Sequence, residues 1–154
     1  MRVGAGLLSG VGATGTAVGL SLVGTSLDLA IPIVDPSALI LIAPVIVIPF
    51  AAGAVLRGST AIVSTVIGAT AAPIVAAFTI DGSCETGSWI VLALVISAIW
   101  AFGIAGIAAF VGDRIGDRPW FERNRARVLP ILIALGLLGV AGWIAFAARA
   151  TPCG

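Results

Sequence analysis

Residue types that could carry out chemistry are few in this chain of 154 residues. It has no histidine, lysine or tyrosine, which excludes imidazole ligation of metals or haem, a retinal Schiff base and lysine-based catalysis. The sequence contains no Ser–His–Asp set, no Cys–His pair and no phosphate-cradling loop. We therefore expect no enzyme activity, no catalytic residue, no cofactor and no metal site.

The two cysteines are Cys84, in the segment DGSCETGS, and Cys153, near the last residue of the sequence. The distribution of charge, described below, places both on the outer side of a membrane. Two thiols on an oxidising side are typical of a disulfide, while two free thiols or bridges to another chain are the alternatives. Two cysteines alone cannot build a four-ligand metal site.

We predict an intramolecular disulfide between Cys84 and Cys153. Digestion without reductant should release one peptide that links the two cysteines, which mass spectrometry would identify. Alkylation of both thiols in the absence of reductant would exclude the bridge and weaken the topology that places the cysteines together.

The elements that position these residues are five apolar runs. Charged residues fall only between charge-free stretches at 3–27, 36–56, 58–80, 86–112 and 128–148, which are 25, 21, 23, 27 and 21 residues long. About 20 helical residues cross a hydrocarbon core of about 30 Å, so each run is long enough to span. The sequence predicts a single transmembrane domain over 1–154, an all-α polytopic bundle with spans at about 3–23, 37–56, 59–80, 88–112 and 128–148.

Charge predicts the orientation of these spans. Arg2, Arg57 and the segment 113–127 together hold seven arginines and three acids, whereas the other breaks and the tail hold one arginine and four acids. Short arginine-rich loops stay cytoplasmic, so we expect the N-terminus inside, the C-terminus outside and a cytoplasmic Arg-rich loop at 113–127. The expected location is the cell membrane, with several passes through the lipid bilayer.

Two segments leave alternatives open. The first run follows Arg2 and has many small residues, as a signal peptide does, but it is longer than a usual signal core, so we expect a retained span. Residues 25–36 contain Pro32 and Pro36, which predict an extended segment on the outer face. That segment is either an ordinary apolar loop or a re-entrant one.

Small residues at intervals of four predict close helix contacts. Lipid does not drive helices together by hydrophobicity, so near approach of the backbones must do it. The first helix, dense in glycine, is expected inside the bundle or against a copy of itself. The predicted packing residues are Gly6, Gly10, Gly15, Gly19, Ser64, Gly68, Ala72 and Ala76.

The segment 113–127 carries the main candidate contact surface. Arg123, Arg125 and Arg127 precede the fifth run, and Trp120 lies nearby. Arginine binds phosphate well, so these residues are predicted to contact lipid headgroups or an acidic partner, with plain anchoring of the cytoplasmic side as the simpler interpretation. Nucleic acid is not expected, because the acids of this segment nearly balance its arginines.

Function follows only in outline. No ionisable residue lies inside a predicted span, which argues against a pump or a proton-coupled carrier. The leading hypothesis is a structural or assembly protein that packs against itself or a larger membrane complex. The alternative is a channel or facilitator for a small solute or ion, formed by the kinked helices 37–56 and 59–80 and lined by hydroxyls. A continuous polar path would favour the channel, and a dry interior would favour the structural role.

Overall fold

The computed structural model of the protein describes residues 2–26, 36–80 and 85–149. Cys84 and Cys153 lie outside these residues, so the disulfide stays a prediction. Nearly all of the predicted outer segment 25–36 also lies outside them.

Five α-helices make up the described part of the chain. They are α1 (Arg2–Ser26), α2 (Pro36–Leu56), α3 (Ser59–Thr79), α4 (Glu85–Ile115) and α5 (Pro119–Arg149). Within a hydrocarbon core every backbone N–H and C=O needs a partner in the protein, and a helix supplies these bonds within one segment even when it is rich in valine and isoleucine. The predicted all-α membrane helix bundle is confirmed.

Four described segments are long and apolar enough to cross a membrane: Val3–Leu20, Ser59–Thr79, Gly87–Ile115 and Pro119–Arg149. The fifth apolar segment, Ile42–Leu56 of α2, is shorter. The chain is therefore a multi-pass membrane protein, while the crossing by α2 and the inside–outside orientation stay predictions.

The segment predicted as an Arg-rich loop at 113–127 is mostly helical. Residues 113–115 continue α4, residues 119–127 begin α5, and only 116–118 connect the two helices. Pro119 stands first in α5, where its missing N–H has no helical acceptor to lose. Charge marks where a helix leaves the hydrocarbon, and it does not mark where the helix ends.

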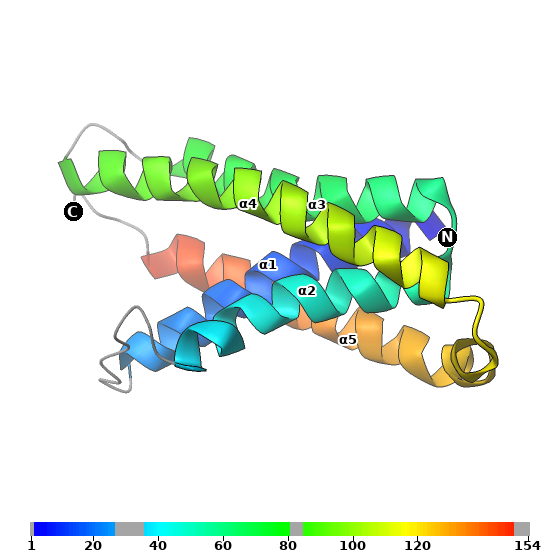
Figure 1. Cartoon of the computed structure of the whole chain (residues 1–154). Helices are drawn as coiled ribbons and strands as arrows, with labels where there is room; N and C mark the ends of the chain where they lie inside the picture. The colour runs from blue at the N-terminus through cyan, green and yellow to red at the C-terminus, as the bar shows by residue number, and fades with distance from the viewer. Residues whose placement is uncertain (1, 27–35, 81–84, 150–154) are drawn as a thin grey trace.

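The span predicted at 128–148 would place Pro130 in the first turn of the last helix, but α5 begins eleven residues before Pro130, at Pro119. Pro130 lies in the interior of α5. There its ring removes one backbone hydrogen bond and favours a bend. Figure 1 shows the first turns of α5 nearly end-on while the rest of the helix crosses the view.

Helix α1 lies at the centre of the bundle and packs against α2, α3 and α5 (Figure 1). On the far side of α2 and α3, α4 packs against both of them. The turn between α2 and α3 is as short as expected, but these two helices contact α1 and α4 more extensively than each other. The α2–α3 pair is thus held together mainly by its neighbours.

The contact of α1 with α3 uses predicted packing residues. A Cβ placed on Gly10 would lie 2.5 Å from the Ala69 nitrogen, and one on Gly6 would overlap the Ser64 side chain. A Cβ on Gly68 would meet the backbone of α1 in the same way. Glycine is therefore required at these positions by the distance between the helices.

Glycines also join α1 to α5, where the two backbones approach closely. A Cβ on Gly12 would lie 2.6 Å from the Cα of Gly136. The glycines that meet here are Gly12, Gly15 and Gly19 of α1 and Gly136, Gly139 and Gly142 of α5. Both glycine faces of α1 are thus occupied within one chain, so a second copy cannot use them without opening the bundle.

Candidate functional site

The turn between α2 and α3 is bound to the turn between α4 and α5 at one end of the molecule. The Arg57 guanidinium pairs with Asp117, and its Nη1 lies 3.7 Å from Oε1 of Glu122. The Gly58 N–H donates to Oδ1 of Asp113 at 2.8 Å. We call these five residues the end clamp.

Backbone strain accompanies the end clamp. Arg57 has φ 53° and Gly58 has φ 94°, both in the left-handed region that glycine adopts most easily. Two consecutive residues with positive φ reverse the direction of the chain within a short turn. The Gly58 N–H then points toward Asp113. The predicted spans 37–56 and 59–80 leave only Arg57 and Gly58 between them, which indicates the turn. Nothing in the sequence indicates the three acidic partners of this turn.

Aromatic rings fix the start of α5 beside the end clamp. The Phe121 ring makes an edge contact with Phe50 of α2, with ring centroids 6.2 Å apart, and a second one with Trp120 at 4.9 Å. Phe121 is half-buried, whereas Trp120 is 60% exposed. The first turn of α5 is therefore anchored on one side and open on the other.

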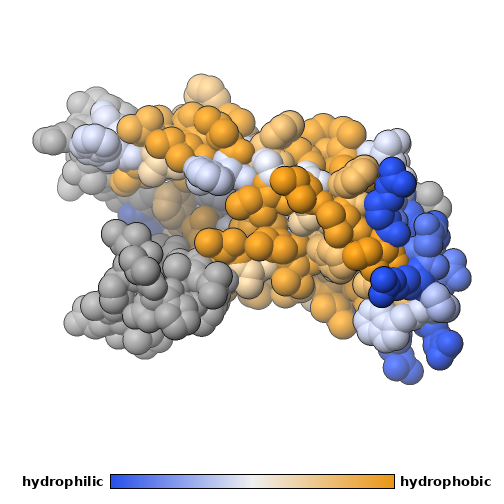
Figure 2. All heavy atoms as spheres, viewed as in Figure 1, coloured by the Kyte–Doolittle hydropathy of each residue, from blue (hydrophilic) through white to orange (hydrophobic). Residues whose placement is uncertain are grey.

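The first turns of α5 carry the predicted contact residues. Arg123, Arg125 and Arg127 are all exposed, and none of them has an acidic partner in the part of the chain that the structure describes. In Figure 2 the hydrophilic atoms gather at this end of the molecule, beyond a body that is mainly hydrophobic. On α5, Arg123 and Arg127 share a face with Trp120, whereas Arg125 lies on the opposite face of the same two turns.

The arginine-rich end of the molecule predicts how the bundle is oriented in the membrane. Arg57 and the turn at 116–118 lie together, so their arginines share one side of the membrane, and the positive charge predicts that this side is cytoplasmic. A reporter fused after Arg118 in intact cells should be protected from external probes. External labelling of that position would reverse the orientation.

Hydroxyls within the spans donate mainly to their own helices. Thr65 Oγ1 donates to the Ala61 carbonyl at 2.8 Å, and Ser97 Oγ donates to the Leu94 carbonyl at 2.8 Å. The same pattern, with an acceptor three or four residues earlier, holds for Ser9, Thr14, Thr16, Ser64, Thr70 and Thr79. These donors are used, so they do not need a solute or a partner helix.

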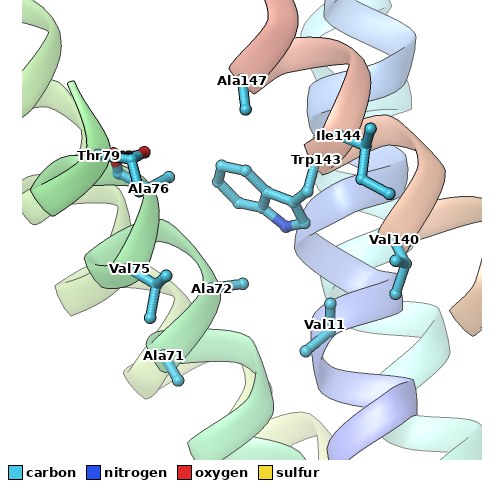
Figure 3. Close-up of a pocket in the computed structure, with 10 residues that line it drawn as sticks. All are labelled: Val11, Ala71, Ala72, Val75, Ala76, Thr79, Val140, Trp143, Ile144 and Ala147. Carbon is cyan, nitrogen blue, oxygen red and sulfur yellow. Dashed lines mark hydrogen bonds between the residues drawn. The ribbon is translucent and has the colours of Figure 1, made fainter.

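One hydroxyl has a second role that the sequence did not indicate. Thr14 Oγ1 accepts a hydrogen bond from the indole Nε1–H of Trp143 at 3.2 Å, which joins α1 to α5. Trp143 then lies in the wall of an apolar pocket of about 390 Å³ between α3 and the α1–α5 pair (Figure 3). No pattern in the sequence links residues 14 and 143, because the pairing depends on how the two helices cross.

The small-residue row of α3 divides at this pocket. Ser64 and Gly68 contact α1, whereas Ala72 and Ala76 line the pocket opposite Trp143 (Figure 3). The lining has no ionisable side chain, so the pocket provides shape and apolar contact but no acid–base chemistry. It can accommodate a bulky apolar group, such as part of a lipid chain.

Metal binding has no support among the described residues. No group of three or more His, Cys, Asp or Glu side chains there is placed to hold an ion.

Comparison of the chain with protein-family models, with curated proteins and with solved structures finds no match.

Proposed function

We propose that the protein is a non-catalytic subunit of a membrane assembly, and that the outer face of α4 carries the contact with the other subunit. One observation supports this most strongly. Trp100 is 67% exposed near the middle of α4, about 20 Å along the helix from either end. Its indole N–H has no acceptor among the described residues.

An unpaired indole N–H at this depth is costly in lipid. Tryptophan favours the two membrane interfaces, where its N–H reaches water or headgroups, and a buried indole normally has a partner. Trp143 has Thr14, and Trp89 lies near the end of its span. A neighbouring subunit that offers an acceptor on the face of α4 would satisfy Trp100.

The shape of the same face suits a helix contact. Gly103 lies one turn from Trp100, and nothing is within 4 Å of where its Cβ would be. Ile99 and Ile107 are each 69% exposed. A small residue between large apolar ones forms a notch that lets a second backbone approach.

The channel alternative has less support. The kinked helices that would form the path have Pro49 and Pro73 fully buried in packed surroundings. The described hydroxyls in the interior of α3 already donate to backbone carbonyls of the same helix: Ser64, Thr65, Thr70 and Thr79. A path for a hydrated solute needs free donors and acceptors along its length, and these residues do not supply them.

A size measurement tests the proposal. Protein extracted with its surrounding lipid should form particles that contain several protein chains, either copies of this 15.3 kDa chain or other subunits. Trp100→Ala should release smaller particles, because it removes both the ring and the unpaired N–H. Trp89→Ala is the matched control, with the same residue type on the same helix and 65% exposure.

Two results would contradict the proposal. One is a single chain in native lipid that the Trp100 substitution leaves unchanged in size. The other is passage of small solutes into vesicles that contain only this protein, at rates above those of empty vesicles, which would favour the facilitator instead.

A further inference from the structure

We infer that the start of α5 binds anionic lipid headgroups around its circumference: Arg123 and Arg127 lie on one face with Trp120, and Arg125 lies on the opposite face. We call these four residues the basic surface. It is distinct from the proposed assembly contact, which lies on the apolar face of α4, so the two can fail separately.

The acids nearest to these arginines have partners elsewhere in the bundle. Asp117 and Glu122 pair with Arg57, and Asp113 accepts the Gly58 N–H, so all three acids of segment 113–127 are directed at the turn between α2 and α3. The sequence suggests that these acids neutralise the arginines around them. In the structure the three acids instead contact Arg57 and Gly58 in the turn between α2 and α3.

The arginines of α5 are left unpaired as a result. Among the described residues, no carboxylate lies within salt-bridge distance of Arg123, Arg125 or Arg127, and all three are exposed. Arg114, in contrast, lies over the Phe110 ring at 5.1 Å. The unpaired guanidinium groups carry forked N–H donors, which match the oxygens of a phosphate.

Depth identifies the phosphate as that of a lipid. The charge-free run begins at Val128, and Arg123 is five residues before it, at most about 8 Å along the helix. The headgroup region on each side of a bilayer is about 5–8 Å thick. The three arginines therefore lie among the headgroups rather than beyond them.

Trp120 precedes Arg123 by three residues, so it lies toward the outer edge of the headgroup region. Its ring is 60% exposed on the first turn of α5, and amphipathic indole rings favour the headgroup level. Phe121 and Glu122 hold this turn against α2 and Arg57, so the surface is fixed before a lipid binds. A prearranged site loses less entropy on binding than a flexible one.

Lipid titration of delipidated protein in detergent, followed by native mass spectrometry, tests the inference. Wild-type protein should bind phosphatidylglycerol more tightly than phosphatidylcholine. The triple variant R123Q/R125Q/R127Q should bind phosphatidylglycerol about a hundredfold more weakly, since each arginine near an anionic surface contributes about fivefold. High salt should reduce the wild-type preference in the same direction.

Matched variants separate charge from folding. R149Q, at the other end of α5 where the side chain is also exposed, should keep the wild-type preference. The triple lysine variant should keep most of it, because lysine retains the charge but not the fork. If the triple glutamine variant does not fold, R127Q alone, on the face shared with Trp120, should lower the affinity about fivefold.

Three outcomes would overturn the inference. The glutamine variants could bind phosphatidylglycerol as the wild type does. Inorganic phosphate could displace the lipid at equal concentration, which would identify a site for soluble phosphate. An acidic protein that is recovered with the wild type and lost with the triple variant, with no change in lipid binding, would identify a protein surface.

Discussion

Replacing Gly68 with leucine is expected to prevent the bundle from assembling. A Cβ at this position would lie 3.0 Å from the Cα and the carbonyl carbon of Leu7 and would overlap the carbonyl oxygen. Backbone atoms cannot rotate away as a side chain does, so α1 and α3 must separate. Overpacking of a core typically costs 1–3 kcal/mol, and we expect about 3 kcal/mol or more here.

Val63→Leu is the matched control for this change. Val63 lies on the same helix, five residues earlier, and is 55% exposed on the opposite face, so a larger side chain meets lipid. The free energy of unfolding, measured by titration with denaturing detergent, should fall strongly for the Gly68 variant and change by less than about 0.5 kcal/mol for the control. Similar losses in both variants would show that α3 does not approach α1 through Gly68.

The sequence predicted the helices well because one physical effect dominates them. A charged side chain is costly in hydrocarbon, so Arg57, Asp113 and Arg149 each end a charge-free run. The bounds predicted for the first four spans agree with the helices to within three residues. Charge-free runs do not predict helical segments that contain charged residues, such as the part of α5 from Pro119 to Arg127.

The packing partners could be predicted only in part. Rows of small residues indicated that Gly10 and Gly68 lie against another helix, and a single sequence cannot indicate which one. Gly12 and Gly139 illustrate the gap, because they meet across more than 120 residues of chain. Their pairing depends on the angle at which α1 crosses α5, and that angle is set by all the contacts of the bundle together.

The end clamp was missed for a different reason. The charge count predicts that Arg57 and Asp117 lie on one side of the membrane. In the structure the two side chains form an ion pair that joins the two turns. A count of charges does not show, however, which group each acid contacts. It treated the acids of 113–127 as neutralising the arginines beside them, whereas they are directed at Arg57 and Gly58. Which arginines are left unpaired therefore follows only from the structure.

Gly58→Ala is expected to destabilise the protein through the backbone alone. Gly58 has φ 94° and ψ 160°, a conformation that is essentially restricted to glycine and costs other residues about 1–3 kcal/mol. No atom lies within 4 Å of where a Cβ would be, so the added methyl group meets nothing. If alanine shifts φ to relieve the strain, the Gly58 N–H turns away from Asp113 and the end clamp loses its 2.8 Å hydrogen bond.

Gly103→Ala makes the opposite prediction from the same chemical change. Gly103 is also without a neighbour within 4 Å, but it lies inside α4 with helical geometry, where alanine is favoured over glycine by up to about 1 kcal/mol. In denaturing-detergent titrations of the single chain, the Gly58 variant should be less stable than wild type and the Gly103 variant equal or more stable. If the two variants shifted in the same direction, the left-handed conformation at Gly58 would not be what holds the turn between α2 and α3 against α4.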